Sequence, residues 1–253
     1  MAIHVTIGKN KVPVTAEKDI DLESAVLFRP FQDWRQAWES EEKKHGDAAL
    51  HLKSIHIQSV DQFSSGKIGF IKFKADAELP ESGKSVPGIT FMRGGSISVL
   101  LVLKTEKSNH PDQLIFTLQP RVPVPAFQFP ELPAGMLDGD GQFAGKAAEE
   151  IKEETGLEIK EDELIDMTEL AYGKEFRGVY PSPDEFLRLF VCEKTLSEKD
   201  IKSLEGKLTG LRDHGESITL KIVQLQEAWK QSPDAKLLAS LALYDALKRE
   251  QKL

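Results

Sequence analysis

Four glutamates lie close together near the middle of the chain, at Glu149, Glu150, Glu153 and Glu154. The pattern around them predicts a short helix, on which residues three and four apart stack on one face. Like charges at these spacings repel, and each pair costs the helix about 0.2–0.5 kcal/mol. A hard divalent cation prefers oxygen ligands and would turn this repulsion into coordination. The cluster therefore predicts a metal site on a helix.

Glycines frame this acidic segment, with Gly135 before a glycine-rich loop and Gly156 directly after the helix. Residues 135–157 resemble the Nudix box, G-x5-E-x7-R-E-U-x-E-E-x-G-U, where U is a bulky aliphatic residue. Seven of the nine defined positions match in register: Gly135, Glu150, Ile151, Glu153, Glu154, Gly156 and Leu157. Gly141 stands where the box has its first Glu, and Glu149 stands where it has Arg.

Two simpler interpretations of the segment are weaker. An acidic helix face is often only solvated, but the spaced glycines and the flanking Leu-Pro-Ala disfavour that reading here. A calcium loop would use Asp138, Asp140, Gln142 and Glu149 at its positions 1, 3, 5 and 12. Its sharp turn needs Gly where the chain has Phe143, and two prolines just upstream would break an entering helix. We reject the calcium loop.

The composition limits the classes of partner. The chain has 253 residues, 40% of them hydrophobic, and a net charge of −8. The hydrophobic content supports a genuine core, and the negative net charge argues against nucleic acid or a membrane surface as the main partner. The one cysteine, Cys192, lies in an apolar run, is expected to pack as a small buried hydrophobe, and excludes an internal disulfide. With no signal-like start and no run long enough to span a bilayer, we expect a soluble, cytoplasmic protein.

The first third of the chain predicts one helix beside several strands. Residues 22–44 follow a helical pattern that Pro30 interrupts, and the helix carries an aromatic stripe of Phe28, Phe31, Trp34 and Trp38. Such a stripe is typical of a core or of a subunit interface, because large exposed apolar patches are rare on soluble monomers. Alternation predicts a short strand or ordered tail at 1–13 and strands at 52–60 and 68–77.

The turn-rich segment 80–88 is the best candidate for a domain boundary. We therefore expect an amino-terminal domain at 1–88, with a helix and a β-rich part, and a second domain at 89–253. Further strands are predicted at 97–103, 114–118, 164–171 and 187–191. A last amphipathic helix would have Ser232 as its N-cap and Pro233 as its first residue.

The resemblance extends beyond the box. Several flanking segments look like those of the ADP-sugar diphosphatases of the Nudix superfamily: 54–75, 86–89, 119–123 and 131–135. The segment 210–216 looks like the plant-type and fungal-type members of that group. The resemblance implies an α+β fold, a Nudix α/β/α sandwich, with a small amino-terminal β-rich domain that helps to form a homodimer. It also implies Mg²⁺-dependent cleavage, with Mn²⁺ as a possible substitute, of a nucleotide sugar such as ADP-ribose or ADP-glucose to AMP and a sugar phosphate.

The family pattern assigns roles on the acidic helix. Glu150 and Glu154 would be the main metal ligands, Glu153 would assist in binding and catalysis, and the backbone carbonyl of Ala134 would contribute. The chemistry agrees, because a divalent metal screens diphosphate oxygens and activates water. The general base of the family usually comes from a loop after the box. Here the segment 178–186 offers Asp184 and Glu185, of which we prefer Glu185; Glu175 is a poorer candidate.

Arg93 and Arg121 are the best candidates for binding substrate phosphates, because arginine is always charged and grips oxygens in a bidentate fork. The alternative for each is a salt bridge at a strand end. Phe127 could stack on a base or pack under the proline-rich loop, and Glu131 in the flanking motif is counted with the substrate-binding residues. His214, in a glycine-flanked turn, is expected to be structural.

The departures from the box leave two hypotheses. The Arg of the family orients a ligand glutamate, a role that Glu149 cannot fill at neutral pH. Lys146 or Lys152 could compensate, or Glu149 could face solvent, and Gly141 removes only an acid that supports the loop or helix. The first hypothesis is a working or slowed diphosphatase, and the second is a nucleotide-sugar binding protein without turnover. The retained glutamate triplet favours the first.

Overall fold

The chain forms two compact units in the computed structural model, which describes residues 2–106, 110–137, 143–174, 176–180, 185–211 and 216–253. The first unit consists of Met1–Gly95 and Ser182–Glu185, and the second of Ser96–Pro181 and Phe186–Leu253. The boundary in the chain thus falls at Gly95, later than the expected 88/89. The physical reason is strand pairing, because residues 89–92 form a strand antiparallel to residues 71–74 and belong with the first sheet.

The first unit is built on one sheet, whose strands are β1 (Ala2–Ile7), β2 (Asn10–Ala16), β3 (His51–Gln62), β4 (Ile68–Glu78), β5 (Ser85–Val86) and β6 (Ile89–Met92). Their order is β1-β2-β3-β4-β5, with β6 also paired to β4. The β2–β3 pair is parallel and the others are antiparallel. The predicted strands at the start of the chain, at 52–60 and at 68–77 are therefore confirmed.

Two helices cover one face of this sheet, α1 (Leu22–Leu27) and α2 (Arg29–His45), followed by the turn η1 (Gly46–Ala48). The break at Phe28 precedes Pro30, which stands in the first turn of α2, where its missing N–H is tolerated. Phe31 is fully buried with its ring 5.7 Å from Phe73, and Trp34 lies 5.1 Å from the same ring. The aromatic stripe therefore packs into the core of its own unit.

The second unit is built on a larger sheet, whose strands are β7 (Ser96–Thr105), β8 (Gln113–Arg121), β9 (Ala126–Glu131), β10 (Ala134–Met136), β11 (Ile165–Asp166), β12 (Leu187–Leu196), β13 (Leu208–Thr209) and β14 (Ile218–Gln224). The order is β11-β12-β7-β8-β14-β13, with β10 paired to β7 and β9 to β8. Strands β7 and β12 are parallel neighbours at the centre. Cys192 on β12 is buried, as expected, and burial raises the pKa of its thiol to about 11.

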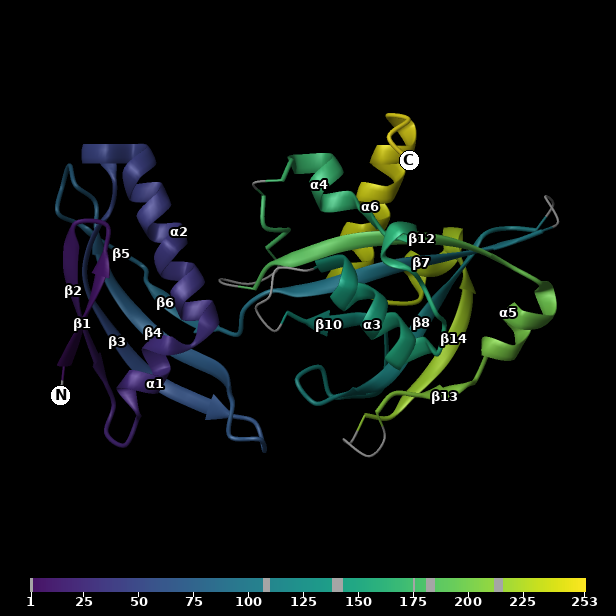
Figure 1. The fold of residues 1–253 in the computed structure, drawn as a ribbon, viewed down its shortest axis with the longest axis horizontal. Helices are drawn as coiled ribbons and strands as arrows, with labels where there is room; N and C mark the ends of the chain where they lie inside the picture. The colour runs from purple at the N-terminus through teal and green to yellow at the C-terminus, as the bar shows by residue number, and fades with distance from the viewer. Residues whose placement is uncertain (1, 107–109, 138–142, 175, 181–184, 212–215) are drawn as a thin grey trace. The chain divides into compact units, whose positions relative to one another are not determined.

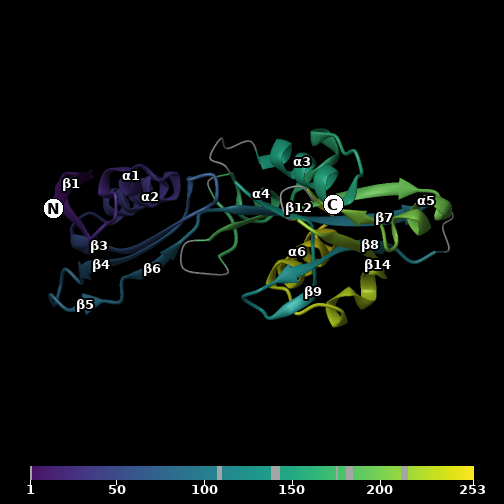
Figure 2. The same ribbon diagram turned by 90° about the horizontal axis from the view of Figure 1, so that it is seen from below.

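Helices lie on both faces of the second sheet (Figures 1 and 2). On one face α3 (Phe143–Thr155) and α5 (Glu198–Leu204) pack on Val99 and Leu101 of β7. On the other face α4 (Met167–Tyr172) and α6 (Ala235–Arg249) pack on Leu100 and Val102. The turns η2 (Glu161–Glu163) and η4 (Leu225–Lys230) complete the unit. Because β7 is covered on both sides, its sequence is almost continuously apolar. The α+β class and the α/β/α sandwich are confirmed.

Two predicted elements were wrong in part. The strand expected at 164–171 shrinks to β11, because Asp166 accepts a hydrogen bond from the Glu169 N–H at 2.8 Å and starts helix α4. The last helix begins at Ala235 with Asp234 as its N-cap, two residues later than expected. Ser232 instead donates its hydroxyl to the Pro130 carbonyl at 2.5 Å and accepts the Asp234 N–H.

Among the described residues, no helix has both the length and the hydropathy that crossing a membrane requires.

Candidate metal and active site

The acidic helix α3 lies against strand β10, and a glycine allows the close approach. Gly135 on β10 lies under the carboxyl group of Glu150, and a Cβ built at this position would overlap that group. Any larger residue would have to push the Glu150 side chain away. The first glycine of the box thus leaves room for the carboxylate of Glu150.

The carboxyl end of α3 is held by the second glycine and by β13. Gly156 has φ +74° and donates its N–H to the Lys152 carbonyl at 2.9 Å. Helices commonly end in this way, with a residue in the left-handed backbone conformation. Thr209 donates its hydroxyl to the Glu154 carbonyl at 2.5 Å, and the Gly210 N–H reaches the Glu153 carbonyl at 3.3 Å. These bonds fix the turn that carries Glu153 and Glu154.

Glu154 is the most deeply buried carboxylate of the cluster, with 6% of its surface exposed. Burial raises the pKa of its carboxyl group to about 8, and the charges of Glu150, Glu131 and Glu216 add to this effect. The Ala134 N–H, at 3.1 Å, is the donor that opposes it. The hydrogen bond from Ala134 offsets only part of the cost of burying the charge of Glu154, so this carboxylate is well suited to bind a cation.

Glu150 has a cationic neighbour on its own helix. Its Oε1 lies 3.1 Å from Lys146 Nζ, and its pKa is raised because burial outweighs this contact. Lys146 also lies 3.1 Å from Glu149, whose side chain is exposed, whereas Lys152 pairs with Glu158. Of the two lysines that could offset the missing arginine of the box, Lys146 is therefore the one in place.

The donor set fits a hard divalent ion although it is not arranged around one point. No three acidic, histidine or cysteine side chains among the described residues converge as a finished metal site. Glu150 is turned to Lys146, and Glu154 to the Ala134 N–H. The half-buried Glu153 lies near enough to raise the pKa of Glu150. Three carboxylates on one rigid helix nevertheless supply the oxygen ligands that Mg²⁺ or Mn²⁺ prefers.

A fourth carboxylate, Glu216, was missed from the sequence. It lies just before β14 and is close enough to raise the pKa of both Glu150 and Glu154. Its Oε2 accepts a hydrogen bond from the Leu211 N–H at 3.3 Å. The segment 210–216 was recognised only as part of a resemblance. The available signal was an acidic residue in this glycine-containing stretch, which lies between β13 and β14.

Glu131 lies beside the cluster between two cations. It is 3% exposed, and it accepts from Arg121 Nε at 2.5 Å and from Lys236 Nζ at 2.9 Å. Lys236 also contacts Asp234 at 3.1 Å, and the pKa of Lys236 is raised because these charges outweigh its burial. Arg121 thus forms the strand-end salt bridge that was the alternative to phosphate binding, while 41% of its side chain stays exposed. No pattern in the sequence indicated that Lys236 would lie beside Glu131.

Three more of the predicted residues lie in the described part of the chain. Arg93 and Glu185 both belong to the first unit, where their side chains are 3.7 Å apart. Phe127 is 90% exposed on the β8–β9 hairpin, so it does not pack under the proline-rich loop. Seven positions named from the sequence lie outside the described residues: Asp138, Asp140, Gly141, Gln142, Glu175, Asp184 and His214.

Comparisons with known proteins show the family of the chain. The family model described as NUDIX domain matches residues 92–241. The chain is 38% identical over 234 residues to Nudix hydrolase 14, chloroplastic, of Arabidopsis thaliana, which covers 91% of this chain and 74% of that protein. The chain therefore belongs to the Nudix hydrolase family.

Two solved structures are also similar. One is an ADP compounds hydrolase, with a TM-score of 0.48 and 16% identity over 80% of this chain and 99% of that one. The other is a mutT/nudix family protein from Listeria innocua, with a TM-score of 0.44 and 16% identity over 62% of this chain and 95% of that one.

Proposed function

We propose that the protein hydrolyses the diphosphate of a nucleoside diphosphate sugar, such as ADP-ribose or ADP-glucose, to a nucleoside monophosphate and a sugar phosphate. The observation that carries the proposal is the carboxylate cluster on α3, with Glu154 buried and without an ion-pair partner among the residues described. The flanking segments that resemble ADP-sugar diphosphatases support this substrate class, and the similar Arabidopsis protein is itself named a hydrolase.

Metal binding would fall to Glu150, Glu153 and Glu154, with the Ala134 carbonyl as a further ligand. When bound, Mg²⁺ or Mn²⁺ would screen the diphosphate oxygens and lower the pKa of a water molecule. Lys146 contacts Glu150 at 3.1 Å and has to release it for this role. Its second partner, Glu149, can hold the displaced ammonium group because both contacts already exist.

We propose Glu216 as the group that orients the attacking water and accepts its proton. Its charge acts on Glu150 and Glu154, so it lies beside the carboxylates that would bind the metal. Glu185 stays the second candidate, as expected from the sequence, and it pairs with Arg93 in the first unit. Comparing Glu216→Gln with Glu185→Gln separates them, because loss of the base lowers kcat by about 10²–10⁴-fold.

Arg121 would bind a phosphate with the exposed part of its guanidinium while Nε stays on Glu131. Lys236 fixes the other oxygen of Glu131, so Arg121 is presented from a rigid support. Arg93 is the second proposed phosphate ligand, and the exposed ring of Phe127 is proposed to stack on the base.

A nucleotide-sugar binding protein without turnover is the second candidate, and a specific contact favours it. Lys146 occupies Glu150, and Glu149 replaces the arginine that orients a ligand glutamate in the family. An assay of AMP release from ADP-ribose with Mg²⁺, run beside a binding titration, distinguishes the two. Binding with no AMP release would support the second candidate.

Assembly and location are also proposals. We expect a homodimer to which the amino-terminal unit contributes, no nucleic-acid or membrane partner, and a cytoplasmic location. The similar Arabidopsis protein is named as chloroplastic, so imaging of the full-length gene product is the appropriate test of location.

A further inference from the structure

One buried arginine outside the carboxylate cluster contacts the start of the box helix. Arg188 on β12 has 5% of its side chain exposed, and none of the roles above uses it. We propose that Arg188 is a positioning residue that sets where α3 begins, and thereby the arrangement of the carboxylates on α3. This inference rests on the proposed function, because its consequence is expressed at the metal-binding helix.

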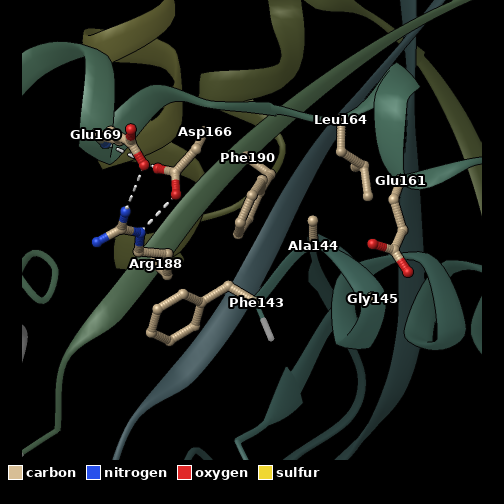
Figure 3. Close-up of a pocket in the computed structure, with 9 residues that line it drawn as sticks. All are labelled: Phe143, Ala144, Gly145, Glu161, Leu164, Asp166, Glu169, Arg188 and Phe190. Carbon is tan, nitrogen blue, oxygen red and sulfur yellow. Dashed lines mark hydrogen bonds and ion pairs between the residues drawn. The ribbon is translucent and has the colours of Figure 1, made fainter. Parts of the chain in front are cut away.

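The guanidinium holds α4 and the turn behind it. Its Nε donates to Asp166 at 2.6 Å, Nη2 donates to Glu169 at 3.4 Å, and Nη1 donates to the Phe176 carbonyl at 2.5 Å. Asp166 is also the N-cap of α4. Figure 3 shows the two carboxylates on one side of the guanidinium. A planar fork with several fixed donors can serve these acceptors together, which a single ammonium group cannot do.

The same guanidinium also contacts α3. Its central carbon lies 5.0 Å from the centroid of the Phe143 ring, and Phe143 is the first residue of α3 (Figure 3). Such a cation–π contact is stronger when the cation is withdrawn from water than at an exposed site. The side chain of Arg188 is buried, so this contact with Phe143 is of the stronger kind.

A pocket beside Arg188 explains why this contact matters. The pocket has a volume of about 380 Å³, with the first turn of α3 on one side and Leu164, Asp166 and Glu169 on another. The first turn of α3 is therefore not packed solidly against α4 at this place. Further along, α3 is anchored in the core by the buried Ala147 and Ile151, whereas Phe143 and Ala144 of the first turn are only partly buried against the same core. Arg188 adds a contact to this less buried turn on the side of the pocket.

A tilt at the start of α3 would reach the metal-binding positions. Glu150 lies about two turns after Phe143 on the same helix, so a change in the direction of the first turn is passed on to it through the helical backbone. First-shell geometry has to be held within about 0.5 Å, so a small shift is sufficient to disturb it. Removing Arg188 also leaves Asp166 and Glu169 without their shared cation, which would loosen the start of α4.

The test uses Arg188→Lys, which keeps the charge but not the fork, and Phe143→Leu, which keeps an apolar side chain but not the ring. Mn²⁺ binding is measured by electron paramagnetic resonance without substrate, and kcat and KM are measured with ADP-ribose. We expect Arg188→Lys to weaken Mn²⁺ binding and lower kcat by about tenfold, with KM for ADP-ribose unchanged. Phe143→Leu should act in the same direction, and the double variant should be less than additive because the two side chains act through one contact.

Lys104→Met is the matched control. It removes an ion pair of 2.6 Å with Glu193 on the neighbouring strands, seven residues along β7 from the partner of Arg188. The control should lose stability but keep its Mn²⁺ affinity. If Arg188→Lys and Phe143→Leu also keep Mn²⁺ affinity and kcat at a temperature where all variants are folded, the proposal is overturned. Failure of the proposed function would look different, with intact Mn²⁺ binding but no AMP release by the unmodified protein.

Discussion

At the scale of single residues, the chemistry depends on carboxylates that repel one another in a partly buried setting. Glu154 illustrates this, because burial and the charges of Glu150, Glu131 and Glu216 raise its pKa together. Lys146 offsets the repulsion at Glu150 from the solvent side, but it reaches Glu150 and Glu149 rather than Glu154. The carboxylates of the cluster therefore repel one another, and a bound divalent cation would neutralise this repulsion.

The raised pKa of Glu154 predicts how stability depends on pH. With a folded-state pKa of about 8 against an ordinary value of 4.5, the carboxyl group of Glu154 holds its proton more tightly in the folded protein than in the unfolded chain. The stabilisation is complete below the unfolded pKa and is lost as pH rises through about 8. In EDTA, urea unfolding of the unmodified protein should show this loss between pH 5 and 8, and Glu154→Gln should show less of it. Identical pH dependence in the two proteins would contradict the assigned burial effect.

The exposed Glu149 gives a second prediction at this scale. Glu149→Arg should restore a cation at the position where the family has arginine and remove one like charge from the cluster. We expect higher turnover at saturating Mg²⁺ together with a higher Mg²⁺ requirement, since orientation improves while the negative potential falls. Turnover measured across a Mg²⁺ titration checks this. An inactive variant would mean that Glu149 is itself a ligand or base.

At the scale of elements, the contact between α3 and β10 carries the site. Gly135→Ala would place a methyl group inside the space of the Glu150 carboxyl, so Glu150 has to move away from β10. We expect weaker Mn²⁺ binding and activity lowered by about 10–100-fold. Gly206→Ala is the control, because it introduces strain at φ +72° with no heavy atom within 4 Å. If both variants lose only stability, the close approach has no functional importance.

The elements with strong local signals were predictable from the sequence, and those fixed by tertiary contacts were not. Strand β7 is apolar on both faces and α3 carries the box, so both were found. Helix α4 was taken for a strand because its start depends on the Asp166 cap and on Arg188. Glu216 and Lys236 reach the site from more than 60 residues beyond the box helix, a proximity that no sequence spacing reveals.

At the scale of the whole molecule, the packing of the aromatic stripe predicts that a substitution in the stripe lowers stability but leaves the oligomeric state unchanged. Trp34 contacts Phe73 within its own unit, so Trp34→Ala should lower the free energy of unfolding by about 3–5 kcal/mol. If the protein is a homodimer, light scattering should give twice the chain mass of 28.2 kDa, and Trp34→Ala should keep that mass while folded. A folded monomeric Trp34→Ala variant of a dimeric protein would show that the stripe also serves the interface.

The most direct test of the central claim, that the α3 carboxylates hold the metal for diphosphate hydrolysis, compares two neighbouring glutamates. AMP release from ADP-ribose at saturating Mg²⁺ is measured for the unmodified protein, for Glu154→Gln and for Glu158→Gln, whose exposed side chain pairs with Lys152 just beyond the helix. We predict turnover that EDTA abolishes, a loss of about 10²-fold or more in Glu154→Gln, and full activity in Glu158→Gln. Undiminished turnover by a folded Glu154→Gln variant would contradict the account.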